Sequence, residues 1–274
     1  MEQTAVRRAP ASGLLAASHP GPAAAVTAVA ALLAVSAEKG AGTVALVAAA
    51  VLAGQLSIGW GNDLVDVSRD RATARADKPL ARGDLAVRPV ALALGVAAAT
   101  CLGLSVLLGG RAAVVHLVCV SLGHAYNLGL KTTALSWAPY AGAFGLLPSV
   151  ASLAGTDPAW APWWATAAGA ALGVGAHLVN VLPDLADDEA TGVRGLPHRL
   201  GATRARVGAA LLLALASLLA VLGPAGRAPA WAFAVLAGIA ALTLLAVGRE
   251  GRWPFRAAMA VALLDVVLLV AAGP

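Results

Sequence analysis

Long apolar segments dominate this chain and restrict what it can fold into. Nine stretches have about the 17 to 25 residues that are needed to cross the hydrocarbon core of a bilayer. They lie at 20–37, 42–61, 89–109, 112–130, 135–154, 162–182, 207–223, 229–247 and 257–272. Only 12% of the residues are charged, whereas a soluble domain has about 25%. The sequence therefore predicts an all-α, polytopic membrane protein with nine transmembrane helices.

The basic residues predict the orientation of these helices. If the loops alternate between the two sides of the membrane, 16 of the 19 Lys and Arg residues fall on the side of the first residue. Positively charged loops stay in the cytoplasm, so we expect a cytoplasmic N-terminus and an external C-terminus in the cytoplasmic membrane of a bacterium. The basic residues are scattered between apolar segments, so the net charge of +5 does not indicate a nucleic-acid partner. The two cysteines, Cys101 and Cys119, lie inside apolar segments and are typical of packed core residues.

An acidic window, 62–70, follows the second apolar segment. If the helix continues through it, Asn62, Asp66 and Asp70 recur every four residues, and Asp63 lies seven residues before Asp70, so all four share one face. Three carboxylates on one face repel one another unless a divalent cation neutralises them, and oxygen ligands favour Mg²⁺. The alternative is a solvated helix end.

A second window, 180–188, repeats the spacing of the first. Asn180, Asp184 and Asp188 again recur every four residues. Each window is followed by a basic loop and then by proline, arginine and glycine, in Lys78-Pro79-Leu80-Ala81-Arg82-Gly83 and in Leu196-Pro197-His198-Arg199-Leu200-Gly201. Four spans separate the copies, which preserves orientation, so we expect helices one to four and five to eight to form a parallel repeat, with helix nine appended.

Two acidic windows beside basic loops suit a ligand with a polyphosphate group. Carboxylates hold Mg²⁺, the ions bridge phosphate oxygens, and Lys or Arg neutralises the remaining charge. The other turns of these helices are apolar, so the rest of the ligand enters the membrane. A lipid diphosphate meets both conditions. If it is allylic, loss of the diphosphate leaves a carbocation, which must meet its acceptor before it meets water.

These motifs resemble the UbiA family of intramembrane prenyltransferases over almost the whole chain. The resemblance rests on the two acidic windows, on the Lys78-Pro79-Leu80 sequence and on the stretch from Tyr126 to Lys131. It implies one domain over residues 1–274, with nine helices around a central cavity. It also implies Mg²⁺-dependent transfer of a prenyl group from an isoprenyl diphosphate, most often to an aromatic or other lipophilic acceptor.

The resemblance also implies roles for individual residues. Two Mg²⁺ ions would be bound, one by Asn62, Asp63, Asp66 and Asp70 and the other by Asn180, Asp184, Asp187 and Asp188. The diphosphate would contact Arg75, Lys78, Arg82, Lys131, Arg194 and Arg199. Asp66, Asp184, Lys131 and Tyr126 would be catalytic. Two positions depart from the family pattern: Asn180 replaces an aspartate, and Lys78 stands where arginine is common.

Two other functions remain open at this point. A terpene cyclase on the same scaffold would capture the cation with the substrate's own double bonds. A transporter of cations or lipid phosphates would use the acids as a midplane site, although their position at helix ends argues against it. His177 is either a packed residue or an acceptor contact. His116 and His124 are expected to pack or to form hydrogen bonds, and the intramembrane Asp265 has no evident partner. The sequence does not indicate an oligomeric state.

Overall fold

The computed structural model describes residues 10–247, except 76–77, 191 and 227, and then residues 249, 253, 256–257, 260–261, 263–265 and 267. The elements formed by these residues are all helical, and the described part of the chain contains no strand, which confirms the all-α prediction. The helices are α1 (Pro10–Ala17), α2 (Pro20–Ser36), α3 (Ala41–Ala72), α4 (Pro79–Arg82), α5 (Val87–Leu107), α6 (Gly110–Leu128), η1 (Leu130–Thr132), α7 (Ala138–Leu153), α8 (Trp163–Val181), η2 (Leu182–Asp184), α9 (Leu185–Ala190), α10 (Leu196–Leu200), α11 (Ala202–Leu222) and α12 (Ala230–Val247).

The first eight predicted spans each overlap with one long helix of the structure. Among the described helices, four have both the length and the apolar composition to cross a membrane, namely α3, α5, α8 with η2, and α11. Large apolar side chains also point outward, such as Leu92, Val96 and Leu107 of α5. Apolar faces of this kind are stable in contact with lipid, whereas their exposure to water is unfavourable. Most of the ninth predicted span, 257–272, lies outside the described residues, so the count of nine stays a prediction.

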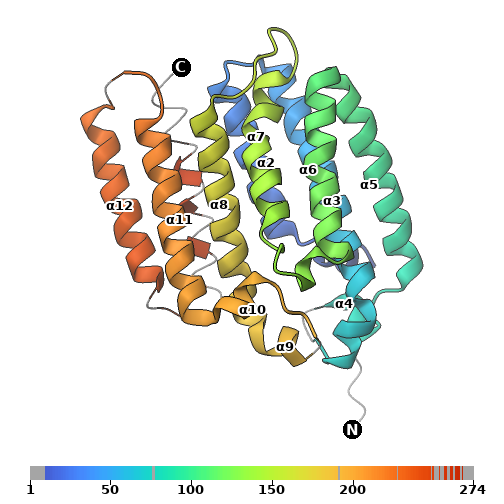
Figure 1. Cartoon of the computed structure of the whole chain (residues 1–274). Helices are drawn as coiled ribbons and strands as arrows, with labels where there is room; N and C mark the ends of the chain where they lie inside the picture. The colour runs from blue at the N-terminus through green and yellow to red at the C-terminus, as the bar shows by residue number, and fades with distance from the viewer. Residues whose placement is uncertain are drawn as a thin grey trace.

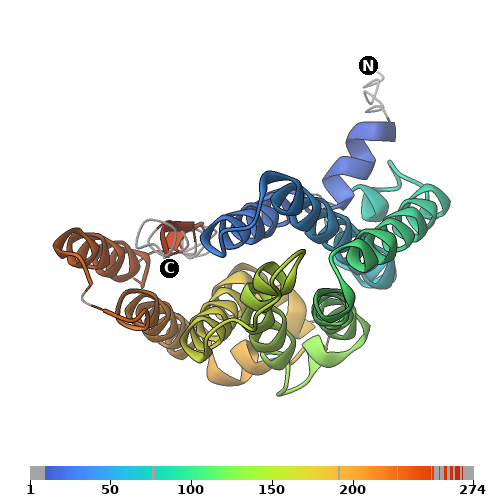
Figure 2. The same cartoon turned by 90° about the horizontal axis from the view of Figure 1, so that it is seen from above.

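The helices surround a central space. Seen from above, α2 and α3 lie on one side, α7 and α8 on the other, with α5 and α6 at one end and α11 and α12 at the opposite end (Figure 2). Helix α7 packs between α6 and α8, and α8 also packs against α11. The approach of α7 and α8 depends on glycine: a Cβ atom on Gly173 would lie 2.5 Å from the carbonyl oxygen of Tyr140. This close packing places Tyr140 beside the central space.

Helix α3 contains the whole first acidic window, as the spacing predicts. Its 32 residues span about 48 Å at 1.5 Å per residue, whereas the hydrocarbon core is about 30 Å thick. The last turns of α3 therefore extend beyond the apolar layer. They hold the carboxylates at the end of the bundle where α4, α9 and α10 also lie (Figure 1).

The second window does not form the helix end that its spacing predicts. Helix α8 ends at Val181, a 3₁₀ turn follows at Leu182–Asp184, and α9 begins at Leu185. Pro183 lies in this turn, and proline cannot donate the backbone hydrogen bond that a continuous helix requires. Asn180 therefore lies in α8, Asp184 in η2 and Asp188 in α9.

The two loops after the acidic windows do resemble each other in structure. The short helices α4 and α10 both have proline in the first turn. Both end at a glycine with positive φ, 80° at Gly83 and 76° at Gly201, a backbone conformation that side chains with a Cβ atom seldom adopt. The similarity of the two loops agrees with the predicted repeat, although the larger repeat of four helices stays a prediction.

Candidate active site

The acids of the first window are buried. The exposed fractions of Asp63, Asp66 and Asp70 are 1%, 4% and 4%. Carboxylates on one face of α3 therefore point into the protein, which excludes the alternative of a solvated helix end. Buried carboxylates need cations or hydrogen-bond donors around them, and the neighbouring elements provide both.

Lys78, in the loop before α4, is the principal cationic partner of this window. Its Nζ lies 2.7 Å from Oδ1 of Asp63, 3.4 Å from Oδ2 of Asp70, and 3.1 Å from Oδ1 of Asn62. Burial by itself would lower the pKa of Lys78, but the attraction of Asp63 and Asp70 outweighs it and raises the pKa above the usual value. Lys78 therefore remains a charged ammonium group inside the carboxylate cluster.

Asp66 binds two other cations. Nζ of Lys131, in η1 after α6, contacts Oδ1 of Asp66, and Nη2 of Arg69 lies 2.8 Å from Oδ2 of the same carboxylate. Burial lowers the pKa of Lys131, although its hydrogen bond to Asp66 opposes the shift. The structure thus brings together Asp66 and Lys131, which are 65 residues apart in the sequence. Arg69 was not predicted as a site residue, because its position inside an acidic run gave no separate signal.

Amide and imidazole groups complete this cluster. Nδ2 of Asn62 lies 3.2 Å both from Oδ2 of Asp66 and from Oδ1 of Asn127 in α6. Nε2 of His19 lies 2.9 Å from Oδ1 of Asp63. His19 has a left-handed backbone, with φ of 54°, at the bend between α1 and α2. No sequence signal pointed to His19, since only the tertiary fold places this bend beside α3.

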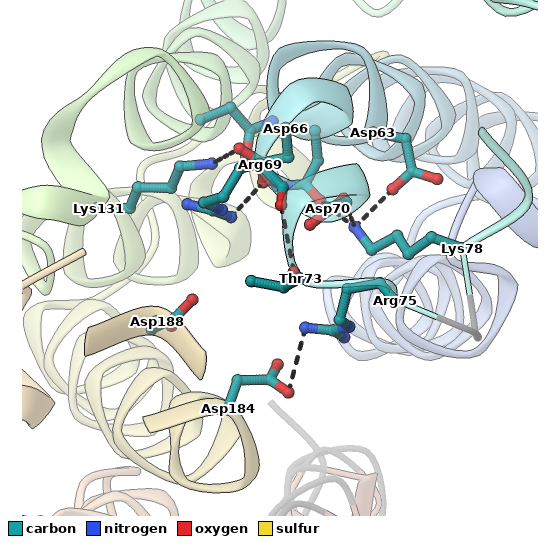
Figure 3. A network of polar contacts seen from close by, with 12 residues as sticks. Asp63, Asp66, Arg69, Asp70, Thr73, Arg75, Lys78, Lys131, Asp184 and Asp188 are labelled. Carbon is teal, nitrogen blue, oxygen red and sulfur yellow. Dashed lines mark hydrogen bonds and ion pairs between the residues drawn. The ribbon is translucent and has the colours of Figure 1, made fainter. Parts of the chain in front are cut away.

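The second window faces the first. Oδ1 of Asp184 lies 3.4 Å from Nη1 of Arg75, in the loop after the first window, and Arg75 points across toward Asp184 (Figure 3). Oδ2 of Asp188 lies 3.5 Å from Nε2 of His198. Burial raises the pKa of Asp188, while the nearby charge of Arg69 opposes the shift. The side chain of Asp187 lies outside the described residues.

Three predicted diphosphate ligands are exposed and have contacts away from the buried carboxylates. Arg82 forms an ion pair with Asp84 at 2.6 Å. Arg194 lies 3.7 Å from Glu189, and Nε of Arg199 donates to the carbonyl oxygen of Arg194. The structure therefore places Arg75, Lys78 and Lys131 among the acids, and leaves Arg82, Arg194 and Arg199 outside the cluster.

An apolar chamber of about 300 Å³ lies below the first window. The residues lining its mouth are polar: His19, Asn62, Tyr126, Asn127, Tyr140 and Asn180. Below them the walls are mostly apolar, with residues such as Val26, Val29, Ala143 and Leu147. The rings of Tyr126 and Tyr140 meet edge to face, with centroids 5.2 Å apart. The chamber can hold an apolar molecule whose charged group remains among the acids.

His177 packs behind the two tyrosines. Its ring centroid lies 4.8 Å from that of Tyr140, and its Nε2 lies 2.9 Å from Oγ of Ser136. The Ser136 hydroxyl in turn accepts a hydrogen bond from the backbone N–H of Leu196, at the start of α10. His177 is therefore a packed residue that is 1% exposed, in agreement with the first of its two interpretations.

Three other intramembrane polar residues, His116, His124 and Asp265, also have partners. Nδ1 of His116 lies 2.7 Å from Oγ of Ser105, and Nε2 of His124 lies 3.2 Å from Oγ of Ser57, which confirms the expected hydrogen bonding. Asp265 accepts a hydrogen bond of 3.3 Å from Ser217, a partner that the sequence did not reveal. Cys101 and Cys119 are buried and unpaired, as predicted.

The oxygen donors of the site suit a hard divalent cation. Among the described residues, no three acidic, histidine or cysteine side chains form a closed metal cage. Lys78, Lys131 and Arg69 pair with the acids instead. However, Oδ2 of Asp63 is buried and has no hydrogen-bond partner. Mg²⁺ is usually held by one or two carboxylates, with water and substrate phosphate completing its shell, so these residues fit an ion that binds together with a phosphorylated ligand.

Comparisons with known proteins agree with this geometry. A family model described as the UbiA prenyltransferase family matches residues 23–269. Comparison with curated protein sequences gives no significant match.

Several solved structures share the fold. One is the apo structure of a UbiA homologue from Aeropyrum pernix K1, with 18% identity and a TM-score of 0.72 over 92% of this chain and 96% of that chain. Another is a UbiA homologue from Archaeoglobus fulgidus bound to GPP and Mg²⁺, with 17% identity and a TM-score of 0.70 over 94% and 99% of the two chains. A structure of digeranylgeranylglyceryl phosphate synthase has 17% identity and a TM-score of 0.65 over 96% and 98%. At these identities, the likeness establishes a common fold.

Proposed function

This chain belongs to the UbiA prenyltransferase family, and we propose that it transfers an isoprenyl group from a Mg²⁺-bound allylic isoprenyl diphosphate to an aromatic or other lipophilic acceptor. The proposal agrees with the GPP and Mg²⁺ that are bound to the homologue from Archaeoglobus fulgidus. It also agrees with the chemistry of the site, which combines oxygen ligands, buried cations and an apolar chamber.

The observation that carries the proposal is the convergence of the two acidic windows at the chamber mouth. Arg75, from the first loop, pairs with Asp184 of the second window, while Asn62 and Asn180 both line the chamber. A charged ligand at this position contacts both windows at once, and an apolar group attached to it enters the chamber. An isoprenyl diphosphate has this combination of groups.

We assign one Mg²⁺ to Asn62, Asp63, Asp66 and Asp70, and a second to Asn180, Asp184, Asp187 and Asp188. When bound, Mg²⁺ would stabilise the negative charge of the leaving diphosphate. Asp63 can contribute its unpaired Oδ2. The protein does not need to bury unpaired carboxylates before the ligand arrives, because Lys78 and Lys131 neutralise them.

The same cations can bind the diphosphate directly. Lys78 and Lys131 would donate hydrogen bonds from their ammonium groups, and Arg75 would donate from its guanidinium group, each charge-assisted and therefore strong. As the carbon–oxygen bond breaks, its electron pair leaves on the diphosphate. Donors that already point to this position stabilise the developing charge without reorganisation.

The chamber then controls the fate of the allylic cation. Its apolar walls exclude water, and the faces of Tyr126 and Tyr140 at the mouth can stabilise positive charge. Electrons of the acceptor ring form the new carbon–carbon bond, and the ring then loses a proton, which the released diphosphate can accept. An enclosed apolar site therefore favours transfer to the acceptor over hydrolysis.

We further propose that the site opens to the cytoplasm of a bacterium, with the N-terminus on the same side. The excess of Lys and Arg in the loops on that side supports this orientation. We propose that residues 1–274 form one domain and that membrane lipid surrounds its outer apolar faces.

The decisive experiment uses the purified protein in detergent or liposomes, labelled isoprenyl diphosphates of several lengths and a panel of aromatic acceptors. We expect diphosphate release and a prenylated acceptor only when Mg²⁺ is present. A cyclic hydrocarbon or terpene alcohol formed without an acceptor would instead identify a cyclase. Transmembrane flux of cation or lipid phosphate without cleavage of any diphosphate would identify a transporter.

A further inference from the structure

Two polar side chains lie deep in the chamber, away from the acids. Gln55 of α3 and His116 of α6 both line it. Gln55 precedes Asn62 by seven residues on the same helix, which places it about 10 Å deeper at 1.5 Å per residue. Polar side chains at such depth are costly in a membrane protein and commonly mark a functional cavity.

The side chain of Gln55 is unpaired within the part of the chain that the structure describes. Among the residues that the structure describes, none forms a hydrogen bond with its side chain. A side-chain amide offers two donors and one acceptor, and leaving them unpaired in an apolar environment is unfavourable. The Gln55 amide is therefore available to a molecule in the chamber.

The hydrogen bonds around His116 determine which of its nitrogens carries the proton. The Ser105 hydroxyl donates its single proton to the carbonyl oxygen of Cys101, at 2.6 Å. Oγ of Ser105 must therefore accept from the His116 Nδ1–H at 2.7 Å. In the neutral imidazole the other nitrogen, Nε2, is then a hydrogen-bond acceptor.

Gln55 and Nε2 of His116 lie at the same level of the chamber. A Cβ atom on Gly54, the residue next to Gln55, would lie 3.4 Å from Nε2 of His116. The absence of a side chain at Gly54 lets α6 approach α3 here. Gln55 and His116 thus line the chamber at the level where the backbone of α3 passes Nε2 of His116.

We propose that Gln55 and His116 form a polar subsite that binds a hydroxyl group of the acceptor, at the end remote from the reacting carbon; this role rests on the proposed function. One hydroxyl group satisfies both residues, because it donates to Nε2 of His116 and accepts from the Gln55 amide. An isoprenyl chain at this position would leave both unpaired. The subsite therefore favours an elongated acceptor that has a hydroxyl at its far end.

The test measures binding without Mg²⁺ or any diphosphate, so it is independent of turnover. Phenylphenol and biphenyl, which differ by one hydroxyl group, are titrated calorimetrically into the purified full-length protein in detergent. We expect phenylphenol to bind about tenfold more tightly than biphenyl, since its hydroxyl group forms hydrogen bonds with polar groups that biphenyl leaves unpaired. The ratio should fall toward one in Gln55→Leu and in His116→Leu.

Biphenyl itself reports whether the chamber of each variant is intact. The matched control is Ser57→Ala, which removes a buried hydroxyl from the same helix outside the chamber lining and should leave the ratio unchanged.

Equal binding of the two probes to the unmodified protein would overturn the proposal, as would a preference that persists in both Leu variants. Prenyl transfer that continues alongside either result would leave the proposed function in place. If the preference for phenylphenol is confirmed but the protein has no transferase activity, only the proposed transferase function is refuted.

Discussion

Arg75 and Asp184 form an ion pair of 3.4 Å that joins the loop after the first acidic window to the second window. The two residues are more than a hundred positions apart in the sequence, and their side chains meet near the chamber mouth. The side chain of Asp184 is 40% exposed, so the pair itself contributes little to stability, about 0–1 kcal/mol. We expect this ion pair to affect binding of the ligand more than stability of the fold.

Arg75→Ala should therefore weaken binding of the isoprenyl diphosphate while the fold remains stable. We expect KM for the diphosphate to rise about tenfold, as the loss of one charge-assisted hydrogen bond predicts, with a change in Tm of at most a few degrees. Arg194→Ala is the control, because Arg194 is a loop arginine that is 67% exposed. An equal effect of the two substitutions on KM would refute the assignment of Arg75.

Asp66→Asn should abolish turnover. The substitution removes the carboxylate that holds Lys131 and Arg69 and deletes one proposed metal ligand, so we expect kcat to fall by about 10² to 10³. Circular dichroism and gel filtration would verify that the variant is folded. Asp84→Asn, at an exposed position, provides the control. Substantial Mg²⁺-dependent activity in Asp66→Asn would contradict the assigned role.

Lys78→Met should destabilise the protein as well as inactivate it. Removal of the ammonium leaves Asp63 and Asp70 buried with fewer compensating charges, and loss of one partner of a buried ion pair typically costs about 3–5 kcal/mol. Thermal unfolding in detergent measures the loss. The same measurement on Arg82→Met should give a much smaller change, because the Arg82 pair with Asp84 is exposed.

Removal of Mg²⁺ should stop the reaction and leave the fold intact. Lysine and arginine side chains neutralise the acids of the first window in the absence of a metal. We therefore expect EDTA to abolish product formation with little effect on Tm, and added Mg²⁺ to restore activity. A protein that unfolds on chelation would show that the metal has a structural role instead.

Gly173→Ala should separate α7 from α8. The new methyl group would meet the carbonyl oxygen of Tyr140 at 2.5 Å, and such overpacking costs about 1–3 kcal/mol. Gly95→Ala in α5 is the matched control, since nothing lies within 4 Å of the corresponding position, and alanine favours the helix. Unfolding curves of the two variants would measure the difference. A stable Gly173→Ala variant would mean that the two helices can move apart without loss.

The sequence predicted those features that depend on local periodicity. The four-residue spacing in the first window gave the inward face of α3 correctly, because one continuous helix determines where Asp63, Asp66 and Asp70 point. The same argument failed at the second window. There Pro183 interrupts the helix, so residues at equal spacing in the sequence do not share one helical face.

Contacts between distant segments were harder to predict. Lys131 was assigned to the site only through the family resemblance, and its partner Asp66 became known from the structure. His19 was missed entirely, because its contact with Asp63 depends on the bend between α1 and α2. The resemblance also assigned exposed arginines such as Arg199 to the diphosphate, and neither a resemblance nor charge in a loop determines where a long side chain lies.

Helix α3 runs without a break from the buried Val47 through Gln55 to Asp70. A rigid rod of this kind fixes the separation between the head-group ligands and the deep amide, and no loop is available to adjust it. An inhibitor that joins a phosphonate to a distant alcohol would therefore need a spacer of one particular length. Homologous series of such compounds should show a sharp optimum and not a gradual trend.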